Sequence, residues 1–504
     1  MHIAKIKRLI IELIVSTIIR QESFLQRYQI RFILTIGALI PVLGISVFGF
    51  DTSSTAIGNN APKRSVNVPY WPSGGPEPAW ELFWFGQVDP TTNYADVRLI
   101  YDDENLVASV HIIDRRIWHD TSPSTASLEE WDAVTLYMDL DGNQGNAPDN
   151  NSYRLVIQFG ASETDKSYQV SYLGNGSNWV AAPISFTADS IYRGEGGPNT
   201  DFDNKGWQLT VVIPFTSLGL SDPPPSGTVW GLGYALHDRD DSSGTYINDQ
   251  VWPEQMDPSK PATWGQLHFG RAQYIKSNLQ PQGTTTIQGG FNGAVVPDAH
   301  VGGNFTCGDG LDHWSDWGEA NYTGSNQINI QNQWDISDYP CFSKYFVTFP
   351  LDSIPAGKVV VFANLRMTMF GNSGGGQWGE PPDSYIQAFT INDPWNESTL
   401  NWNNAPLAFE NLSGTWVKPT QTSNQREYFW DVSKAVAEAY QSGGPVRLAL
   451  YSADGERHTG KYFWSSDSND WGGSVRPALQ VTWGAVCNSE DVECHYTYLP
   501  IITN

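Results

Sequence analysis

Charged residues are scarce in this chain of 504 residues, since Asp, Glu, Lys and Arg together make up 16% of it and about a quarter is usual. Basic residues are the scarcer kind, 29 against 54 acidic ones, and the formal net charge is -25. A protein that neutralises phosphates needs clustered Lys and Arg, and docking on anionic lipid needs the same residues. The balance argues against nucleic acid and an anionic membrane surface as partners.

Chemical motifs are also few. The chain contains neither a His-Glu-x-x-His zinc motif nor a phosphate-binding loop. Methionine and histidine could in principle hold haem, but no spacing singles out a pair among Met138, Met256, His111, His119 and His237. We therefore expect no enzyme and no haem.

Cysteine is rare as well, with only Cys307, Cys341, Cys487 and Cys494 in the chain. An even count behind an export signal is typical of disulfides. Proximity in the sequence pairs Cys307 with Cys341 and Cys487 with Cys494. No Cys-x-x-Cys pair is present, which argues against a zinc site.

The amino terminus predicts export. Arg27 and Arg31 precede an uncharged run over residues 32–50, and Ser54-x-Ala56 offers a small-residue cleavage site. We expect residues 1–56 to be a signal peptide with a long basic region, and an extracellular or cell-surface location. An uncleaved membrane anchor is the alternative, because 19 uncharged residues approach the length of a membrane span. After cleavage, no stable membrane insertion is expected.

What is abundant is aromatic and β-forming sequence. Aromatic residues make up 13% of the chain, and 21 of them are Trp. Short runs rich in β-branched and aromatic residues are bounded by Gly, Asp and Asn clusters, as in residues 106–113, 133–140 and 208–215. No amphipathic helix separates these runs, so we predict an all-β protein made of two antiparallel, jelly-roll-like β-sandwich domains in tandem. One short helix is expected after Asp431 or Ser433, ending at Gly443.

The polar stretch between the two sets of strands suggests where the domains divide. We expect a lead-in loop at 57–78, a first sandwich at 79–270 and a linker at 271–294. A second sandwich is expected at 295–484, followed by a tail with a Cys pair at 485–504.

The second half carries a specific pattern. The stretch from Asp393 to Pro406 reads DPWNESTLNWNNAP, and YFWDV, KYFWSS and RPALQVTW follow it in order. This segment resembles the DNRLRE family, the group of carbohydrate-binding module family 96. The resemblance runs from about Asp298 to Gly484 and implies an extracellular β-sandwich attached to proteins that handle polysaccharide.

The first half resembles carbohydrate-binding modules of family 9 and the related DOMON sandwiches, from about Val66 to Gly270. The motifs that carry this resemblance are YDDENL, WDAVTLYMDLDG, GWQLTVVIPFTSLG and WGLGYALHDRD, in that order. Both resemblances imply a noncatalytic protein that binds polysaccharide or oligosaccharide. A structural or adhesive cell-envelope protein without a sugar site is the alternative from a different class.

Aromatic planes that cover the C–H face of a pyranose are the expected sugar-binding groups. The candidates are Trp118, Trp131, Arg154, Trp252 and Trp264 in the first domain and Trp378 and Trp471 in the second. The competing interpretation is that each Trp fills a sandwich core. Trp395 and Trp402 belong to the family pattern and are expected to pack.

One acidic turn has spacing suited to a metal ion. Asp139, Asp141 and Asn143 offer oxygens at alternating positions, which suits a structural calcium ion. An ordinary Asp-Gly turn is the alternative. Asp238-Arg-Asp-Asp241 is a second acidic turn with a weaker claim.

Overall fold

The computed structural model describes most of the chain from residue 63 to residue 486. Residues outside the description within that range are 73–78, 143–144, 275–277, 304–309, 333–340, 376–378, 380, 421–423 and 456–457. The signal peptide predicted at 1–56 and the tail predicted at 485–504 therefore lie wholly or almost wholly outside the described residues. Those that are described belong to one compact unit, Ala61–Asn504. Among them, no helix has the length and apolarity to cross a bilayer.

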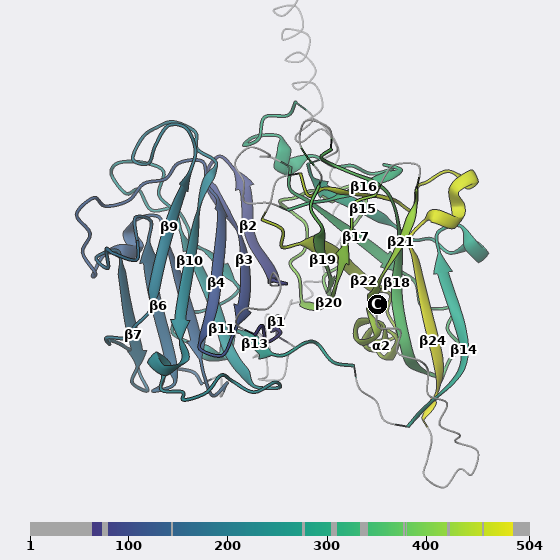
Figure 1. The fold of residues 1–504 in the computed structure, drawn as a ribbon, viewed down its shortest axis with the longest axis horizontal. Coiled ribbons are helices and arrows are strands. Elements are labelled where there is room, and N and C mark those ends of the chain that lie inside the picture. Colours follow the sequence, from purple (N-terminus) through teal and green to yellow (C-terminus); the bar gives the residue numbers. More distant parts are fainter. Residues whose placement is uncertain are drawn as a thin grey trace, which may run out of the picture. The chain divides into compact units, whose positions relative to one another are not determined.

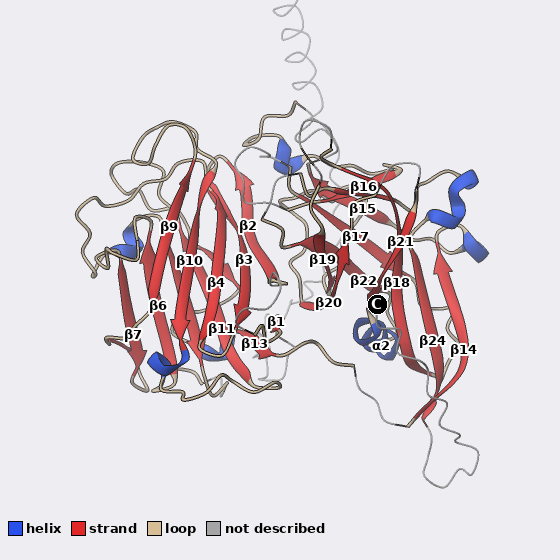
Figure 2. Cartoon of the chain, in the orientation of Figure 1, coloured by secondary structure: helices blue, strands red, loops and turns tan. Residues whose placement is uncertain are grey.

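Strands dominate the described residues (Figure 2), so the all-β prediction is confirmed. One layer of the first sandwich is a five-stranded sheet in the order β2 (Glu81–Asp89), β3 (Thr92–Tyr101), β4 (Asn105–Ile113), β10 (Gly206–Pro214) and β9 (Thr187–Arg193). Its other layer is part of a larger sheet in the order β1 (Ser65–Val68), β13 (Gly265–Phe269), β11 (Val229–His237), β5 (Ala133–Asp139), β6 (Ser152–Gln158), β7 (Gln169–Gly174) and β8 (Trp179–Ala181), with β12 (Gln250–Trp252) beside β11. Apolar side chains from both layers form one core, and Figure 1 shows the five-stranded layer lying over β11 and β6.

The second sandwich also has two layers. One is a six-stranded sheet in the order β14 (Leu279–Gln288), β24 (Ala478–Val486), β18 (Val359–Asn372), β23 (Lys461–Trp464) and β16 (Gln327–Ile330), with β21 (Arg426–Asp431) beside β18. The other contains β15 (Asp298–Gly302), β17 (Ser343–Phe349), β22 (Val446–Ser452), β19 (Ser384–Thr390) and β20 (Glu410–Val417). A second apolar core fills the space between them.

Helices are short throughout the described residues. The predicted helix is α2 (Ser433–Ser442), which packs on β18 and β22. Asp431 accepts a hydrogen bond from the Ser433 amide at 2.9 Å, and Gly443 ends the helix with a φ of 73°, as left-handed C-terminal glycines do. The short 3-10 helices are η1 (Leu128–Glu130), η2 (Phe215–Leu218), η3 (Pro261–Thr263), η4 (Phe291–Gly293), η5 (Trp317–Glu319) and η8 (Asp470–Val475).

The two sandwiches share one sheet. Strand β1 pairs in parallel with β13 of the first sandwich, and its residue Ser65 pairs with Glu410 of β20 in the second. The result is a 13-stranded sheet that runs through both. The prediction of a linker at 271–294 is wrong in part, because residues 279–288 form β14 and pair with β24. Strand β14 lies at the edge of its sheet and consists mostly of Gln, Thr, Gly and Pro. This polar composition is similar to that of a linker, which explains the error.

A third apolar cluster lies where the outer face of β2 and β3 meets β17, β19 and β22. Every residue of β3 after its first is buried, including Arg98, which is 1% exposed. A strand at the surface of a single sandwich usually has one face in water, but β3 does not. The face that would be wet is covered by the second sandwich.

A lysine lies inside this cluster. Lys344 of β17 is 1% exposed, and its Nζ lies 4.5 Å and 4.6 Å from the ring centres of Trp84 and Tyr94 in the first sandwich. It lies 3.7 Å and 5.1 Å from those of Trp402 and Tyr451 in the second. The negative faces of aromatic rings attract a cation. We call these four rings and the lysine the Lys344 cage.

We expect Trp402→Ala to lower the free energy of unfolding by about 3–5 kcal/mol, because truncating a buried Trp loses its apolar contacts and leaves a cavity. Trp402 is 3% exposed, whereas Trp416 is 41% exposed and provides the control. Urea denaturation would measure both variants, and Trp416→Ala should cost under about 1 kcal/mol. Equal losses in the two variants would contradict the role assigned to the cage.

Candidate functional site

Cross-strand pairing brings three large side chains onto one face of the first sandwich. Arg154 of β6 lies opposite Tyr137 of β5 and Tyr172 of β7. Residues paired directly across a sheet point to the same side. The alternation that sends Leu136 and Leu155 into the core therefore directs these three away from it.

Arg154 is held by stacking and charge. Its guanidinium lies 4.9 Å from the ring centre of Tyr172 and 6.0 Å from that of Tyr137. It forms an ion pair with Glu129 of η1, and its side chain remains 18% exposed. Its buried Nε has no protein hydrogen-bond partner. The guanidinium is therefore positioned firmly.

A histidine extends this network. Nδ1 of His237, the last residue of β11, lies 3.0 Å from Oδ2 of Asp249. Its Nε2 lies 3.4 Å from Oε1 of Glu129, which also accepts a hydrogen bond from Thr135 Oγ1 at 2.7 Å. We call the surface formed by Glu129, Tyr137, Arg154, Tyr172, His237 and Asp249 the Arg154 face.

Electrostatics favour the charged forms in this network. Burial alone would raise the pKa of Glu129, but its hydrogen bond with His237 and the charges of His237 and Arg154 lower it to about 2. Burial opposes protonation of His237, but hydrogen bonds with Asp249 and Glu129 outweigh it and raise its pKa. The network combines fixed donors and acceptors with the partly exposed ring of Tyr172, whereas Tyr137 is 2% exposed and supports Arg154 from within. This chemistry suits a polyhydroxylated ligand.

Two aromatic residues beside the Arg154 face were not singled out in the sequence. Tyr246 is 62% exposed, and its ring centre lies 4.8 Å from the guanidinium of Arg239, which donates to the carbonyl of Glu129. Trp179 is partly buried and stacks on Trp264, with ring centres 6.2 Å apart and planes 3° apart. Tyr246 lies in a turn of Ser, Gly and Thr, and that context was the available signal.

Two of the predicted sugar-binding tryptophans belong to the interior. Trp252 is 1% exposed and packs 4.2 Å from Phe83, while Trp264 is 0% exposed. Neither presents a ring face to solvent, so the structure corrects the prediction that they cover a sugar. The competing core interpretation holds for both. Trp402 is buried, as expected of the family pattern.

The remaining predicted tryptophans have mixed positions. Trp118 and Trp131 are half-buried in the segment that leads into β5, and the indole of Trp131 lies near Gly244 in the turn that carries Tyr246. Trp131 therefore borders the Arg154 face. Trp378 lies outside the described residues, as does the side chain of Trp471, so their roles stay predictions.

A polar cavity of about 240 Å³ lies where β1, β2 and β20 meet, and its lining includes Asn67, Glu81, Arg271, Tyr385 and Asn411. Glu81 accepts hydrogen bonds from Asn411 Nδ2 at 2.7 Å and from the Tyr385 hydroxyl at 3.4 Å. Burial raises the pKa of Glu81 to about 7. The cavity can take a small polar ligand.

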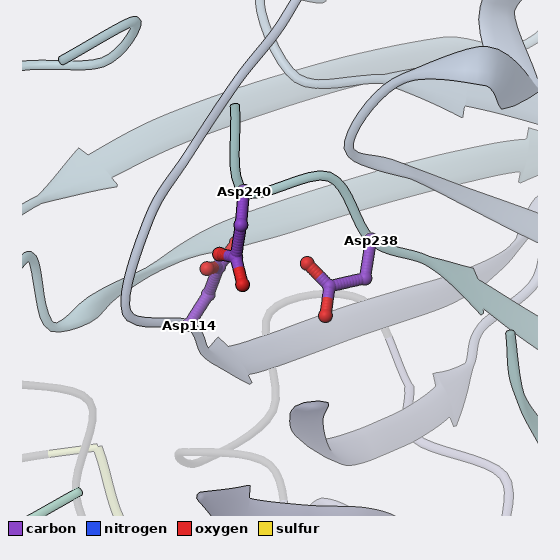
Figure 3. A group of neighbouring side chains, drawn as sticks. All are labelled: Asp114, Asp238 and Asp240. Carbon is purple, nitrogen blue, oxygen red and sulfur yellow. The ribbon is translucent and has the colours of Figure 1, made fainter. Parts of the chain in front are cut away.

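The predicted calcium turn is only partly visible. Asp139 is buried at the end of β5, Asp141 accepts a hydrogen bond from Asn151 Nδ2 at 2.8 Å, and Asn143 lies outside the described residues. Calcium there stays a prediction. The structure brings a different acidic group together, since carboxylate oxygens of Asp114, Asp238 and Asp240 all lie within 4.8 Å of one another (Figure 3).

The cysteine pairs are likewise only partly visible. Cys341 is buried, and no free cysteine occurs among the described residues. Cys307, Cys487 and Cys494 lie outside them, so both predicted disulfides stay predictions.

One serine has a sequence context that is also found in hydrolases. Gly371 to Gly375 spells Gly-x-Ser-x-Gly, a pattern that serves catalysis when the serine sits on a strand-to-helix turn. Here Ser373 follows β18, and the next described element is strand β19. Its hydroxyl donates to the carbonyl of Gly460 at 3.4 Å. Among the described residues, which leave out 376–378 and 380, no helix follows Ser373 before β19.

Comparison with known proteins gives a family match for a large part of the second sandwich. Residues 314–482 match the model of carbohydrate-binding module family 96. The resemblance predicted from the Asp393–Pro406 stretch is thereby confirmed for this segment. No curated protein matches the chain.

Solved structures similar to the chain include two of a family 9 carbohydrate-binding module from Caldicellulosiruptor kristjanssonii. One, in complex with cellotriose, is 14% identical with a TM-score of 0.29 and covers 43% of this chain and 100% of its own. The other, in complex with glucose, is 16% identical with a TM-score of 0.28 and covers 42% of this chain and 100% of its own. A protein from Bacteroides uniformis, described as a candidate carbohydrate-binding protein, is 14% identical with a TM-score of 0.31 and covers 41% of this chain and 100% of its own. Family 9 is the family that the first half was predicted to resemble.

We expect Glu129→Gln to destabilise the protein at pH 7 by about 1–3 kcal/mol, because it removes the charged partner of Arg154 and His237. The pKa of Glu129 is lowered from its ordinary 4.5 to about 2, so its contribution is present above pH 4.5 and is lost as the pH falls toward 2. Urea denaturation of both proteins at pH 7 and pH 3 should show a smaller difference at pH 3.

The control is Glu427→Gln, whose carboxylate lies 3.1 Å from Arg366 and is 48% exposed. An exposed ion pair contributes under about 1 kcal/mol. A Glu129→Gln effect that is as small as the control, or that does not change with pH, would show that the network does not hold a charged Glu129.

Proposed function

We propose that the chain is an exported, noncatalytic protein that binds polysaccharide or oligosaccharide through the Arg154 face, at or outside the cell surface. The observation that carries the site is the stacked Arg154 guanidinium, which lies between Tyr137 and Tyr172 and forms an ion pair with Glu129. Such a group offers planar donors beside aromatic surface, and its position is fixed before any ligand arrives.

Two further observations support carbohydrate as the ligand class. Residues 314–482 match a family of carbohydrate-binding modules. Tyr246, next to the Arg154 face, packs on Arg239 and is still 62% exposed, so its ring offers solvent-facing aromatic surface. Aromatic faces cover the C–H groups of a sugar at low cost in conformational entropy. The acidic surface, with a formal charge of -25, favours neutral over anionic sugars.

We expect Arg154→Ala to weaken sugar binding at least ten-fold, since arginine anchors in binding sites commonly contribute more than 1.4 kcal/mol. The protein would first be screened on a glycan array and with cellotriose. The affinity for the best ligand would then be measured by isothermal titration calorimetry. Tyr246→Ala should also weaken binding without loss of stability, because its ring is 62% exposed.

The matched control is Arg426→Ala, an exposed arginine on β21 of the second sandwich, which should bind as the unaltered chain does. Glu81→Gln would report any contribution from the polar cavity. Binding that survives Arg154→Ala and Tyr246→Ala would move the site elsewhere. Failure to bind any sugar would leave the structural or adhesive role as the better account.

A further inference from the structure

Two strand ends in the first sandwich place carboxylates against each other. Asp114 directly follows β4 of the five-stranded sheet, and Asp238 directly follows β11 of the large sheet, with Asp240 two residues later. Figure 3 shows the carboxylate of Asp240 beside that of Asp114, with the carboxylate of Asp238 turned toward them. The group therefore spans both layers of the sandwich at one end.

Burial makes this arrangement of carboxylates energetically unfavourable by itself. Asp114 is 0% exposed and Asp238 is 1% exposed. Neither oxygen of Asp238 and only one oxygen of Asp114 has a protein hydrogen-bond partner. The nearest side-chain donors, Asn93 Nδ2 and Trp207 Nε1, favour the charged carboxylates but do not complete hydrogen bonds with them. Buried polar oxygens without partners are rare and cost about 1–3 kcal/mol or more each.

Neighbouring arginines offset the negative charge only in part. Burial raises the pKa of Asp240 and of Asp238 despite the opposing charges of Arg116 and Arg115 on the first and of Arg239 on the second. Arg115 forms an ion pair with Asp203 at 2.7 Å. Arg239 directs its guanidinium to the carbonyls of Asp238 and Glu129 and to the ring of Tyr246. Within the described part of the chain, no lysine or arginine forms an ion pair with Asp114, Asp238 or Asp240.

A fourth carboxylate adds to the negative charge. Asp132 is fully buried, and the charges of Asp114 and Asp238 act on it. Its own oxygens accept from the backbone amides of Trp118 and Arg239. Burial and then the neighbouring carboxylates raise the pKa of Asp114, of Asp132 and of Asp238, and burial raises that of Asp240 to about 6.

We propose that Asp114, Asp238 and Asp240 form a binding site for a divalent cation of the calcium class. The donors are carboxylate oxygens, which hard cations prefer. Three carboxylates supply up to six oxygens, and calcium tolerates irregular geometry and added water better than magnesium does. A bound ion would tie the end of β4 to the end of β11 and so join the two layers.

The other acidic group of the described residues provides a contrast. Asp298, Glu397 and Asp467 also place oxygens within 4.8 Å of one another. There the buried member, Asp298, accepts hydrogen bonds from Ser466 Oγ at 2.6 Å and from the Tyr345 hydroxyl at 2.7 Å. Its oxygens are satisfied by the protein, so this second group has no comparable need for a cation.

The test is a calcium titration of the full chain after treatment with EDTA. We expect one calcium ion to bind by isothermal titration calorimetry, and a 100-fold excess over its dissociation constant to raise Tm by about 2–5 °C. Magnesium at the same concentration should give a smaller shift. Asp238→Asn and Asp240→Asn should each lose at least ten-fold in calcium affinity, and Asp238→Asn should be at least as stable as the unaltered chain in EDTA, because a neutral amide removes buried charge.

Two controls separate this site from others. Asp467→Asn alters the satisfied acidic group, and Asp141→Asn alters the turn after β5, so both should keep the calcium response. The proposal is overturned if calcium neither binds nor raises Tm, if Asp238→Asn keeps the response, or if Asp141→Asn abolishes it. The last outcome would assign the ion to the turn at Asp139–Asp141.

Discussion

The contact between the two sandwiches is the constraint on which the rest of the structure depends. At its centre, Lys344 of the second sandwich lies among four aromatic rings, two from each side. Asp96 of the first sandwich accepts hydrogen bonds from the hydroxyls of Tyr94 and Tyr451 beside it. Burial lowers the pKa of Lys344, and the charge of Asp96 opposes that shift, while the faces of the four rings favour the ammonium form. Because the rings come from both sandwiches, the cage forms only when both are folded and joined.

The sheet shared by the two sandwiches fixes the spacing between them. Two modules on a flexible linker gain avidity through the reach of the linker. Here β1 extends one sheet through both sandwiches, and β14 occupies much of the segment where a linker was expected. If the Arg154 face binds saccharide as proposed, any second site in the other sandwich would therefore stand at a fixed distance from it. Spacing along the polymer would then contribute to specificity.

The Arg154 face and the acidic group are connected through one short segment. His237 contributes to the first and Asp238 to the second, and the amide of Arg239 binds Asp132. The end of β11 is therefore fixed from two sides. A rigid segment of this kind keeps the ligand-facing groups in place at little entropic cost on binding.

Sequence reasoning reached the strands and the single helix because these depend on local patterns. Short runs of β-branched and aromatic residues mark the strands, and Gly443 ends α2 by its left-handed conformation. The role of Arg154 in sugar binding stays a prediction. The tryptophans show where local patterns fail. Trp252 and Trp131 both stand beside polar or turn-forming sequence, yet Trp252 is 1% exposed and Trp131 is half-buried. Which loop folds over which ring is a matter of long-range packing.

The sequence by itself determined an all-β chain with a family 96 segment and an acidic surface, because composition, period and motif order are properties of the chain alone. Only the tertiary structure decided that β3 is buried on both faces, that β1 joins the sheets, and that Asp114 meets Asp238 across more than a hundred residues. The physical reason is that each of these three features is a contact between segments far apart in the chain, which bury their surfaces against one another. A local sequence pattern contains no information on which distant segment will cover a given surface.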